Sequence, residues 1–98
     1  MKIQVTELAN EDLINIWLYG NENWGERLAD DYLFELDSNM QTLRQNPQRY
    51  PEHKGVTPPF RLMPFRSHLV IYEIQNTSIN ILRVLQKNMD TESHIKLS

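Results

Sequence analysis

Two arginines in the second half of the chain are the residues whose types and spacing could do chemistry. Arg61 and Arg83 each fall within an apolar run, with apolar neighbours two positions away. A planar guanidinium group binds carboxylate or phosphate through paired hydrogen bonds. If both project from the sheet face opposite the covering helices, with Arg66 and Lys87 near its ends, they form a cationic patch for such groups. The alternative is structural: Arg83 pairs with Glu73 across a hairpin, and Arg61 pairs with an acid from the first half.

A histidine and a tyrosine could add acid–base chemistry to these arginines. His68 and Tyr72 have the same parity on one predicted strand, so they share a face with Val70 and Ile74. Beside arginines, an imidazole and a phenol could serve as base and acid in RNA cleavage. The plainer interpretation places Tyr72 in the core, between its apolar neighbours, and His68 at the surface.

The sequence lacks the residue patterns of the common cofactor sites. It has no cysteine, and His53, His68 and His94 do not have the spacing of metal ligands. No P-loop, dinucleotide fingerprint or nucleophile elbow is present. We therefore expect neither a cofactor nor a metal. The N-terminus lacks the apolar core of a signal peptide, and no apolar stretch approaches the roughly 20 residues that span a bilayer. This predicts a cytoplasmic protein with no membrane contact.

Charge is divided unevenly along the chain. Ten basic against thirteen acidic residues give a net charge of −3, which excludes a protein that coats nucleic acid non-specifically. The first 37 residues hold nine acids and two bases, whereas the remaining 61 hold four acids and eight bases. Such asymmetry can mark an interaction face; the alternative is solvated helix surfaces followed by a sheet that uses arginine.

Apolar periodicity predicts a single α+β domain over residues 1–98. A strand at 3–5 precedes two amphipathic helices, at 7–21 and 25–46, which form an antiparallel hairpin with Thr6 as the first cap. Residues 47–59 contain four of the five prolines and predict a long irregular connection. Strands follow at 60–63, 68–74 and 79–85, and a short helix at 91–97 completes the order β-α-α-β-β-β-α.

We expect these elements to form a mainly antiparallel, twisted sheet with the helical hairpin on one face. The pattern predicts that the last two strands form a hairpin with a four-residue loop, 75–78. Pro64 must break, bulge or turn the strand before Phe65, because proline cannot donate to a strand ladder.

Four large rings lie on or between the two predicted helices: Trp17, Tyr19, Trp24 and Tyr32. Aromatic residues at helical spacing usually belong to a core. The alternative is a groove between the helices and a small sheet, open to an amphipathic segment of a partner.

A set of short motifs follows one order along nearly the whole chain. Its members are Ala9, Asp12-Leu13 and Ile16; Trp24-Gly25, Tyr32, Leu36, Leu43 and Asn46-Pro47; Arg61; SHLVIY at 67–72; and RVLQKNMD at 83–90. In this order and spacing the motifs resemble the ParE toxins of the RelE/ParE superfamily, which are bacterial type II toxin–antitoxin proteins. The last motif resembles the ParE branch in particular.

The resemblance implies the architecture above and also a function. ParE toxins poison DNA gyrase, trap it on cleaved DNA and stop replication, without being nucleases. A ParD-like antitoxin is implied as well, whose C-terminal part wraps the toxin and whose N-terminal part binds operator DNA. Gln86 departs from the family, where histidine is frequent. Because glutamine cannot act as a general base near neutral pH, this departure weakens a nuclease interpretation more than a binding one.

The leading hypothesis is therefore a toxin that inhibits DNA gyrase, through its A subunit, by binding and not by catalysis. It would contact DNA only indirectly, through gyrase or the antitoxin. The residues assigned to target binding are Arg61, Arg66, Arg83, Gln86, Lys87 and Met89. The antitoxin is expected along the helical hairpin and the sheet edge, at Trp17, Tyr32 and Arg83.

Two alternatives remain open. One is a ribosome-dependent mRNA endonuclease of the RelE type, which would use Arg61, Arg83 and Tyr72. RelE-like ribonucleases tend to be strongly basic, as phosphate contacts require, whereas this chain is net acidic. The other is a degenerate scaffold that only binds its antitoxin.

Overall fold

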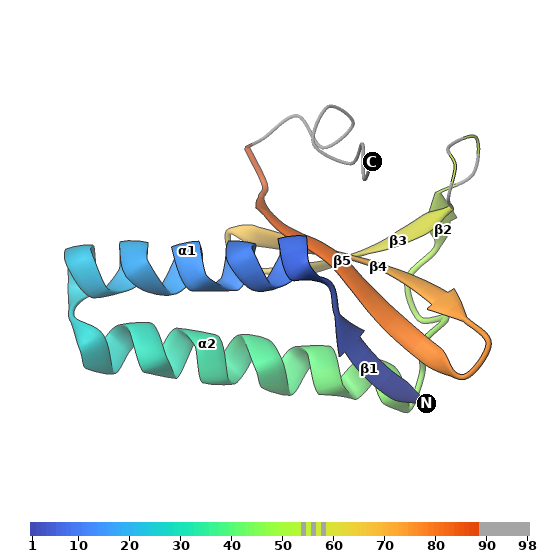
Figure 1. Cartoon of the computed structure of the whole chain (residues 1–98), viewed down its shortest axis with the longest axis horizontal. Coiled ribbons are helices and arrows are strands. Elements are labelled where there is room, and N and C mark those ends of the chain that lie inside the picture. Colours follow the sequence, from blue (N-terminus) through green and yellow to red (C-terminus); the bar gives the residue numbers. More distant parts are fainter. Residues whose placement is uncertain (54, 56, 58, 89–98) are drawn as a thin grey trace.

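Helices and strands form two layers in the computed structural model, which describes residues 1–53, 55, 57 and 59–88. Strand β1 (Lys2–Val5) leads into helix α1 (Glu7–Trp24), and α2 (Glu26–Gln41) continues into a short 3-10 helix, η1 (Thr42–Arg44). The remaining strands are β2 (Glu52–His53), β3 (Phe60–Phe65), β4 (His68–Gln75) and β5 (Ser78–Gln86). The helices run antiparallel beside each other, and the turn that joins them lies well beyond the strands (Figure 1).

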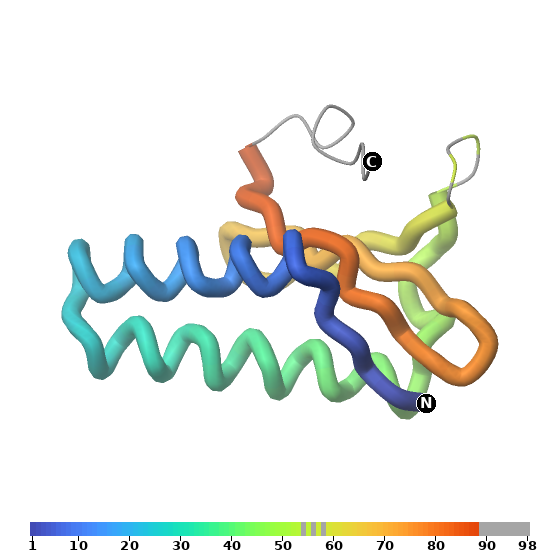
Figure 2. The backbone as a smooth tube through the Cα atoms, viewed as in Figure 1, coloured from blue at the N-terminus to red at the C-terminus, as the bar shows by residue number. Residues whose placement is uncertain are grey.

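The strands pair in the order β1-β5-β4-β3-β2. β1 is parallel to β5, and the three other pairings are antiparallel. The first strand of the chain therefore lies beside the last, as the blue and orange tubes in Figure 2 show. The predicted α+β class and the mainly antiparallel sheet with a helical hairpin are confirmed.

Each face of the sheet carries its own apolar cluster. Met63, Val70 and Tyr72 belong to the cluster that packs against the helices, together with Leu36 of α2. The far-face cluster consists of Phe60, Ile71, Leu82 and Leu85, with Leu62 packed against them. The alternation follows from the period of two along a strand, which sends successive side chains to opposite faces.

An irregularity in β5 changes this alternation near its C-terminal end. Tyr72 pairs with Ile81, and Ile71 pairs with Arg83, so Leu82 is an extra residue on the β5 side. Such a bulge re-aims the side chains that follow it. Arg83 consequently starts from a position opposite Ile71, at the edge of the far-face cluster.

Glycine forms the turn between the two helices. Gly25 has φ 95°, in the region that side-chain-bearing residues rarely adopt, so the chain reverses over one residue. Its amide bonds to the carbonyl of Asn21, and its carbonyl accepts from Ala29. At the other end of α1, Thr6 Oγ1 accepts a hydrogen bond from the Ala9 amide at 3.1 Å, which confirms the predicted cap. The first helix extends to Trp24, further than its predicted end at residue 21.

The prediction that Pro64 interrupts a strand was wrong. β3 runs through it, and Pro64 pairs with Leu69 of β4. β2 pairs only with Phe60 and Arg61. Among the described residues, the outer edge of β3 at Pro64 therefore has no strand beside it, and proline is tolerated on such an edge because no ladder bond is lost there.

Two other local predictions were also corrected. The turn between β4 and β5 has two residues, not four, and Asn76 adopts φ 48°, a conformation that asparagine tolerates better than most residues. The proline-rich connection is not wholly irregular, because it contains β2. The predicted helix at 91–97 lies outside the described residues.

Candidate functional site

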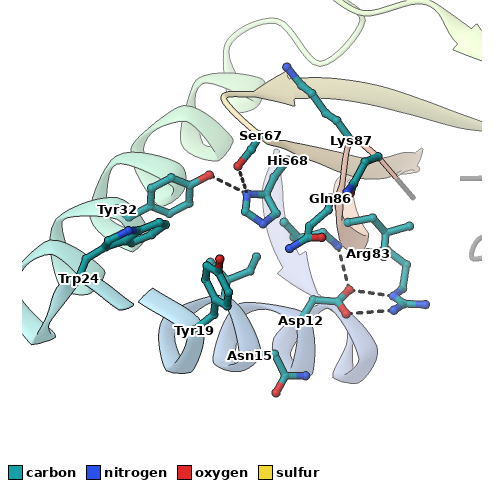
Figure 3. A pocket seen from close by; sticks show the side chains of 14 residues that line it. Asp12, Asn15, Tyr19, Trp24, Tyr32, Ser67, His68, Arg83, Gln86 and Lys87 are labelled. Carbon is teal, nitrogen blue, oxygen red and sulfur yellow. Dashed lines mark hydrogen bonds and ion pairs between the residues drawn. The ribbon is translucent and has the colours of Figure 1, made fainter. Parts of the chain in front are cut away.

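A groove of about 800 Å³ opens between α1, α2 and the C-terminal end of β5 (Figure 3). Both helices contribute aromatic side chains to it. Ser67 comes from the turn before β4, His68 is the first residue of β4, and β5 with the residues after it contributes 83–88. The groove forms because α1 packs against β5, and because the helices continue past the end of the sheet.

A histidine paired with a tyrosine lines the inner part of this groove. His68 is only 8% exposed, and its Nδ1 lies 2.6 Å from the hydroxyl of Tyr32 and 3.3 Å from Oγ of Ser67. Burial lowers the pKa of His68 below its ordinary value of 6.5, because the charged imidazolium loses hydration. The ring is therefore neutral at pH 7 and joins β4 to α2 by a hydrogen bond.

The opposite side of the groove is closed by an acidic clamp from α1. Asp12 Oδ2 accepts from Arg83 Nε at 2.8 Å and from the Val84 amide at 2.9 Å. Asp12 Oδ1 accepts from Arg83 Nη2 at 3.0 Å. Both side chains are largely buried, and the hydrogen bond to Asp12 raises the pKa of Arg83 still further. The carboxylate thus binds side chain and backbone of β5 together.

Two rings project at the outer end of the groove. Tyr19 and Trp24 are each 54% exposed and meet edge to face, with centroids 5.6 Å apart. Trp17, which we expected near the same surface, is not among the lining residues. Its indole Nε1 instead donates to Asp30 Oδ1 at 2.7 Å, so it joins α1 to α2.

The mouth of the groove is polar. Gln86 and Lys87 are exposed at its rim, and the Lys87 amide donates to the Ser67 carbonyl at 2.9 Å. No carboxylate of the described residues pairs with the ammonium group of Lys87. Because Arg83 is paired with Asp12 and burial lowers the pKa of His68, Lys87 supplies the unbalanced positive charge among the described residues that line the groove.

Arg61 and Arg83 do not form one patch, and the prediction of a shared cationic patch was wrong. Arg61 has the same parity as Met63 and Phe65, which puts it on the helix side of the sheet, where it donates to the Tyr50 carbonyl. Arg83 lies on the groove, paired with Asp12. The structural alternative was right that Arg83 is held by an ion pair within the chain, but the acid is Asp12 and not Glu73, which accepts from Asn80 Nδ2. Arg61 bonds a backbone carbonyl where that alternative expected an acid.

Tyr72 has the structural role that the plainer interpretation gave it. Its side chain is fully buried, and its hydroxyl donates to the Pro47 carbonyl at 2.7 Å. Burial raises the pKa of this phenol, while the nearby Arg61 opposes the shift. His68, by contrast, is buried and not a surface residue, because Tyr32 of α2 packs over it.

Arg66 lies beside the groove but does not line it. It adopts φ 51° in the turn between β3 and β4, pairs with Glu35 of α2, and stacks on the rings of Phe65 and Tyr32. These contacts hold the turn against α2 and so support the strand that carries His68.

The groove therefore brings together four of the predicted site residues: Tyr32, Arg83, Gln86 and Lys87. Arg61, Arg66 and Trp17 lie outside it, and Met89 falls outside the described residues. The residue to which the sequence gave no site role is Asp12, which entered only as a member of the family motifs. Its position three residues after Ala9 and four before Ile16, on the flank of the buried stripe, was the available indication.

Two kinds of feature are absent from the described parts of the chain. No group of three or more histidine, aspartate or glutamate side chains there could hold a metal ion. None of the helices in those residues combines the length and apolar character that crossing a bilayer requires.

Comparison with known proteins decides the family. The model of the ParE toxin of the type II toxin–antitoxin system, parDE, matches residues 3–91. The chain belongs to this ParE toxin family. The resemblance inferred from the motifs is confirmed, over nearly the whole length for which it was predicted.

Individual ParE relatives are distant in sequence but similar in length. Toxin ParE1 of Caulobacter vibrioides is 27% identical over 92 residues, which cover 94% of this chain and 95% of the relative. Toxin ParE1 of Mycobacterium tuberculosis is 27% identical over 88 residues, covering 89% and 90%.

A solved structure supports the fold independently. The chromosomal ParDE toxin–antitoxin system from P. aeruginosa contains a chain that matches with a TM-score of 0.77, covering 88% of this chain and 95% of that one, at 18% identity. At this identity the likeness supports the architecture alone.

Proposed function

We propose that this ParE-family chain acts in the cytoplasm by binding and inhibiting DNA gyrase, through its A subunit, without catalysing a reaction. Replication then stops, and a ParD-like antitoxin neutralises the toxin by covering it. DNA is contacted only indirectly, through gyrase or through the antitoxin. Membership of the ParE toxin family supports the toxin role, and the gyrase target is the finer step that the proposal adds.

The observation that carries the proposal is that the groups a nuclease would need are already engaged in contacts within the chain. The buried Tyr72 donates its hydroxyl hydrogen bond to the Pro47 carbonyl, and Arg61 donates to the Tyr50 carbonyl. Arg83 lies at the groove, held by Asp12. General acid–base catalysis needs its groups within hydrogen-bond reach of one substrate. Each of these three side chains is instead held by a structural contact, although Arg61 and Tyr72 are neighbours across β3 and β4, and this favours a protein that acts by binding.

The groove has the composition of a protein-binding surface. Exposed rings at one end, a partly apolar lining and a polar, basic mouth match the general pattern of an interface core with a polar rim. We assign the target contact to this rim, with Lys87 and Gln86 as the central residues and Arg83 beside them. Arg61 and Arg66, outside the groove, and Met89, outside the described residues, stay predictions from the sequence. The antitoxin is assigned to Tyr32, Arg83 and Trp17.

The decisive experiment is a supercoiling assay with purified gyrase and the purified chain. We expect loss of supercoiling and accumulation of cleaved DNA bound to gyrase. Lys87→Gln should weaken inhibition by about threefold to tenfold, the effect of losing up to roughly 1.4 kcal/mol of interaction. Lys2→Gln is the matched control, because Lys2 is an exposed lysine on β1, away from the groove. Unimpaired supercoiling at excess chain would refute the proposal.

One observation favours the RelE-type endonuclease as a second candidate. His68 is neutral and lines the groove that also contains Lys87, so an imidazole base and a cation do share one site. On this candidate, mRNA is cut at the ribosomal A site in a translation extract, and His68→Gln abolishes cutting. Expression of the chain with no growth defect would instead favour a scaffold that only binds its antitoxin.

A further inference from the structure

Asp12 makes three hydrogen bonds to β5 beyond the point where β1 ends, and among the described residues no other strand lies beside β5 there. β1 ends at Val5, and Thr6 takes over by bonding the carbonyls of Ile81 and Leu82. Asp12, one and a half turns further along α1, then accepts from the Val84 amide and twice from Arg83. The carboxylate occupies the edge of β5 as a strand would.

The contact with Asp12 also determines where the guanidinium group of Arg83 lies. The strand register places Arg83 opposite Ile71, a member of the far-face cluster. Its guanidinium nevertheless lies against Asp12 of α1 and lines the groove (Figure 3). A bidentate pair between arginine and carboxylate fixes the plane of the guanidinium as well as its position.

We propose that Asp12 is a positioning residue: it holds Arg83 and the end of β5 on the groove side, so that Arg83, Gln86 and Lys87 form one surface. Asp12 has both oxygens engaged within the chain and acts on the target through Arg83 and not by direct contact. This inference rests on the proposed function for its activity readout. The orientation of the Arg83 side chain and the protection of the Val84 amide from hydrogen exchange can be measured whatever the target is.

The variant that isolates the clamp is Asp12→Asn. It keeps the shape of the side chain but replaces one acceptor oxygen with an NH₂ group, which cannot accept from a guanidinium or an amide. The matched control is Glu11→Gln, because Glu11 is the adjacent exposed acid on α1 and its charge also raises the pKa of Arg83. The control removes the same charge and leaves the three hydrogen bonds in place.

Three readouts are taken at a temperature where every variant is folded. We expect Asp12→Asn to speed hydrogen exchange at the Val84 amide and to shift the Arg83 Nε–H resonance. Exchange at the Ile71 amide should not change in Asp12→Asn, and Glu11→Gln should leave both the Val84 exchange rate and the Arg83 resonance as in the wild type. Gyrase inhibition by Asp12→Asn should fall by about tenfold or more, which corresponds to about 1.4 kcal/mol. In combination with Arg83→Lys the losses should not add, because both substitutions break one interaction.

Growth arrest on expression separates failure of this inference from failure of the gyrase proposal. If wild-type chain leaves gyrase untouched but arrests growth, gyrase is not the target, and the same variants are compared by growth arrest. The positioning role is overturned if Asp12→Asn inhibits gyrase as strongly as the wild type does, or, where the wild type acts only on growth, arrests growth as strongly. Additive losses in the double variant would overturn it too, since they mean that Asp12 contacts the target itself.

Discussion

Removing the Tyr72 hydroxyl tests whether this residue is a structural anchor or a catalytic acid. The hydroxyl donates to the Pro47 carbonyl at 2.7 Å from a fully buried ring, so it ties the central strand β4 to the connection that follows η1. Tyr72→Phe deletes this bond and keeps the ring. A lost hydrogen bond costs about 0.5–1.5 kcal/mol, and an unpaired carbonyl adds to this. Pro47 is only partly buried, so water can reach its carbonyl, and we expect a total of about 1–2 kcal/mol.

The free energy of unfolding is measured by urea denaturation and by thermal melting. At about 4–8 °C per kcal/mol for a domain of this size, the melting temperature should fall by roughly 5–15 °C. Tyr19→Phe is the control, because Tyr19 is exposed and its hydroxyl has no partner among the described residues; it should change stability by less than about 0.5 kcal/mol. Toxicity should persist in Tyr72→Phe wherever the chain is folded. Unchanged stability together with lost toxicity would refute the anchor role and revive the catalytic one.

Three further outcomes follow from particular contacts. Because the pKa of His68 lies below its unfolded value of 6.5, its contribution to stability is complete above pH 6.5 and is lost as pH falls toward the folded pKa. Denaturation between pH 7.5 and 5 should show this fall in stability. His68→Gln should make the fall smaller, whereas His53→Gln, at an exposed position, should leave it unchanged. Gly25→Ala should cost about 1–3 kcal/mol in the same denaturation assay, because φ 95° is strained for alanine; a neutral result would contradict the one-residue turn. Leu36→Ala, at a fully buried position of α2, should cost about 2–5 kcal/mol, and a smaller loss would mean that the helices pack loosely on the sheet.

Much of the fold could be predicted because its determinants are local. The apolar period of α1 and α2, the Thr6 cap and the alternation in β4 each depend on residues within a few positions of one another. The motifs that indicated the ParE family are likewise contiguous or regularly spaced, and the family match over residues 3–91 bears them out. Pro64 and the β4–β5 turn were mispredicted because strand neighbours and register, which local patterns do not contain, decide them.

The sequence alone determined the class of this protein: its α+β order, its acidic helical hairpin and basic second half, and its membership of a toxin family. Only the tertiary structure decided the site. Asp12 and Arg83 lie 71 positions apart, and Tyr32 and His68 lie 36 apart, so no local pattern links them. Their pairing depends on where β1 stops, on the bulge that sets Arg83 opposite Ile71, and on how α1 and α2 extend past the sheet. Each of these is a consequence of packing distant segments, which is the reason the two arginines that share a pattern in the sequence serve different parts of the molecule.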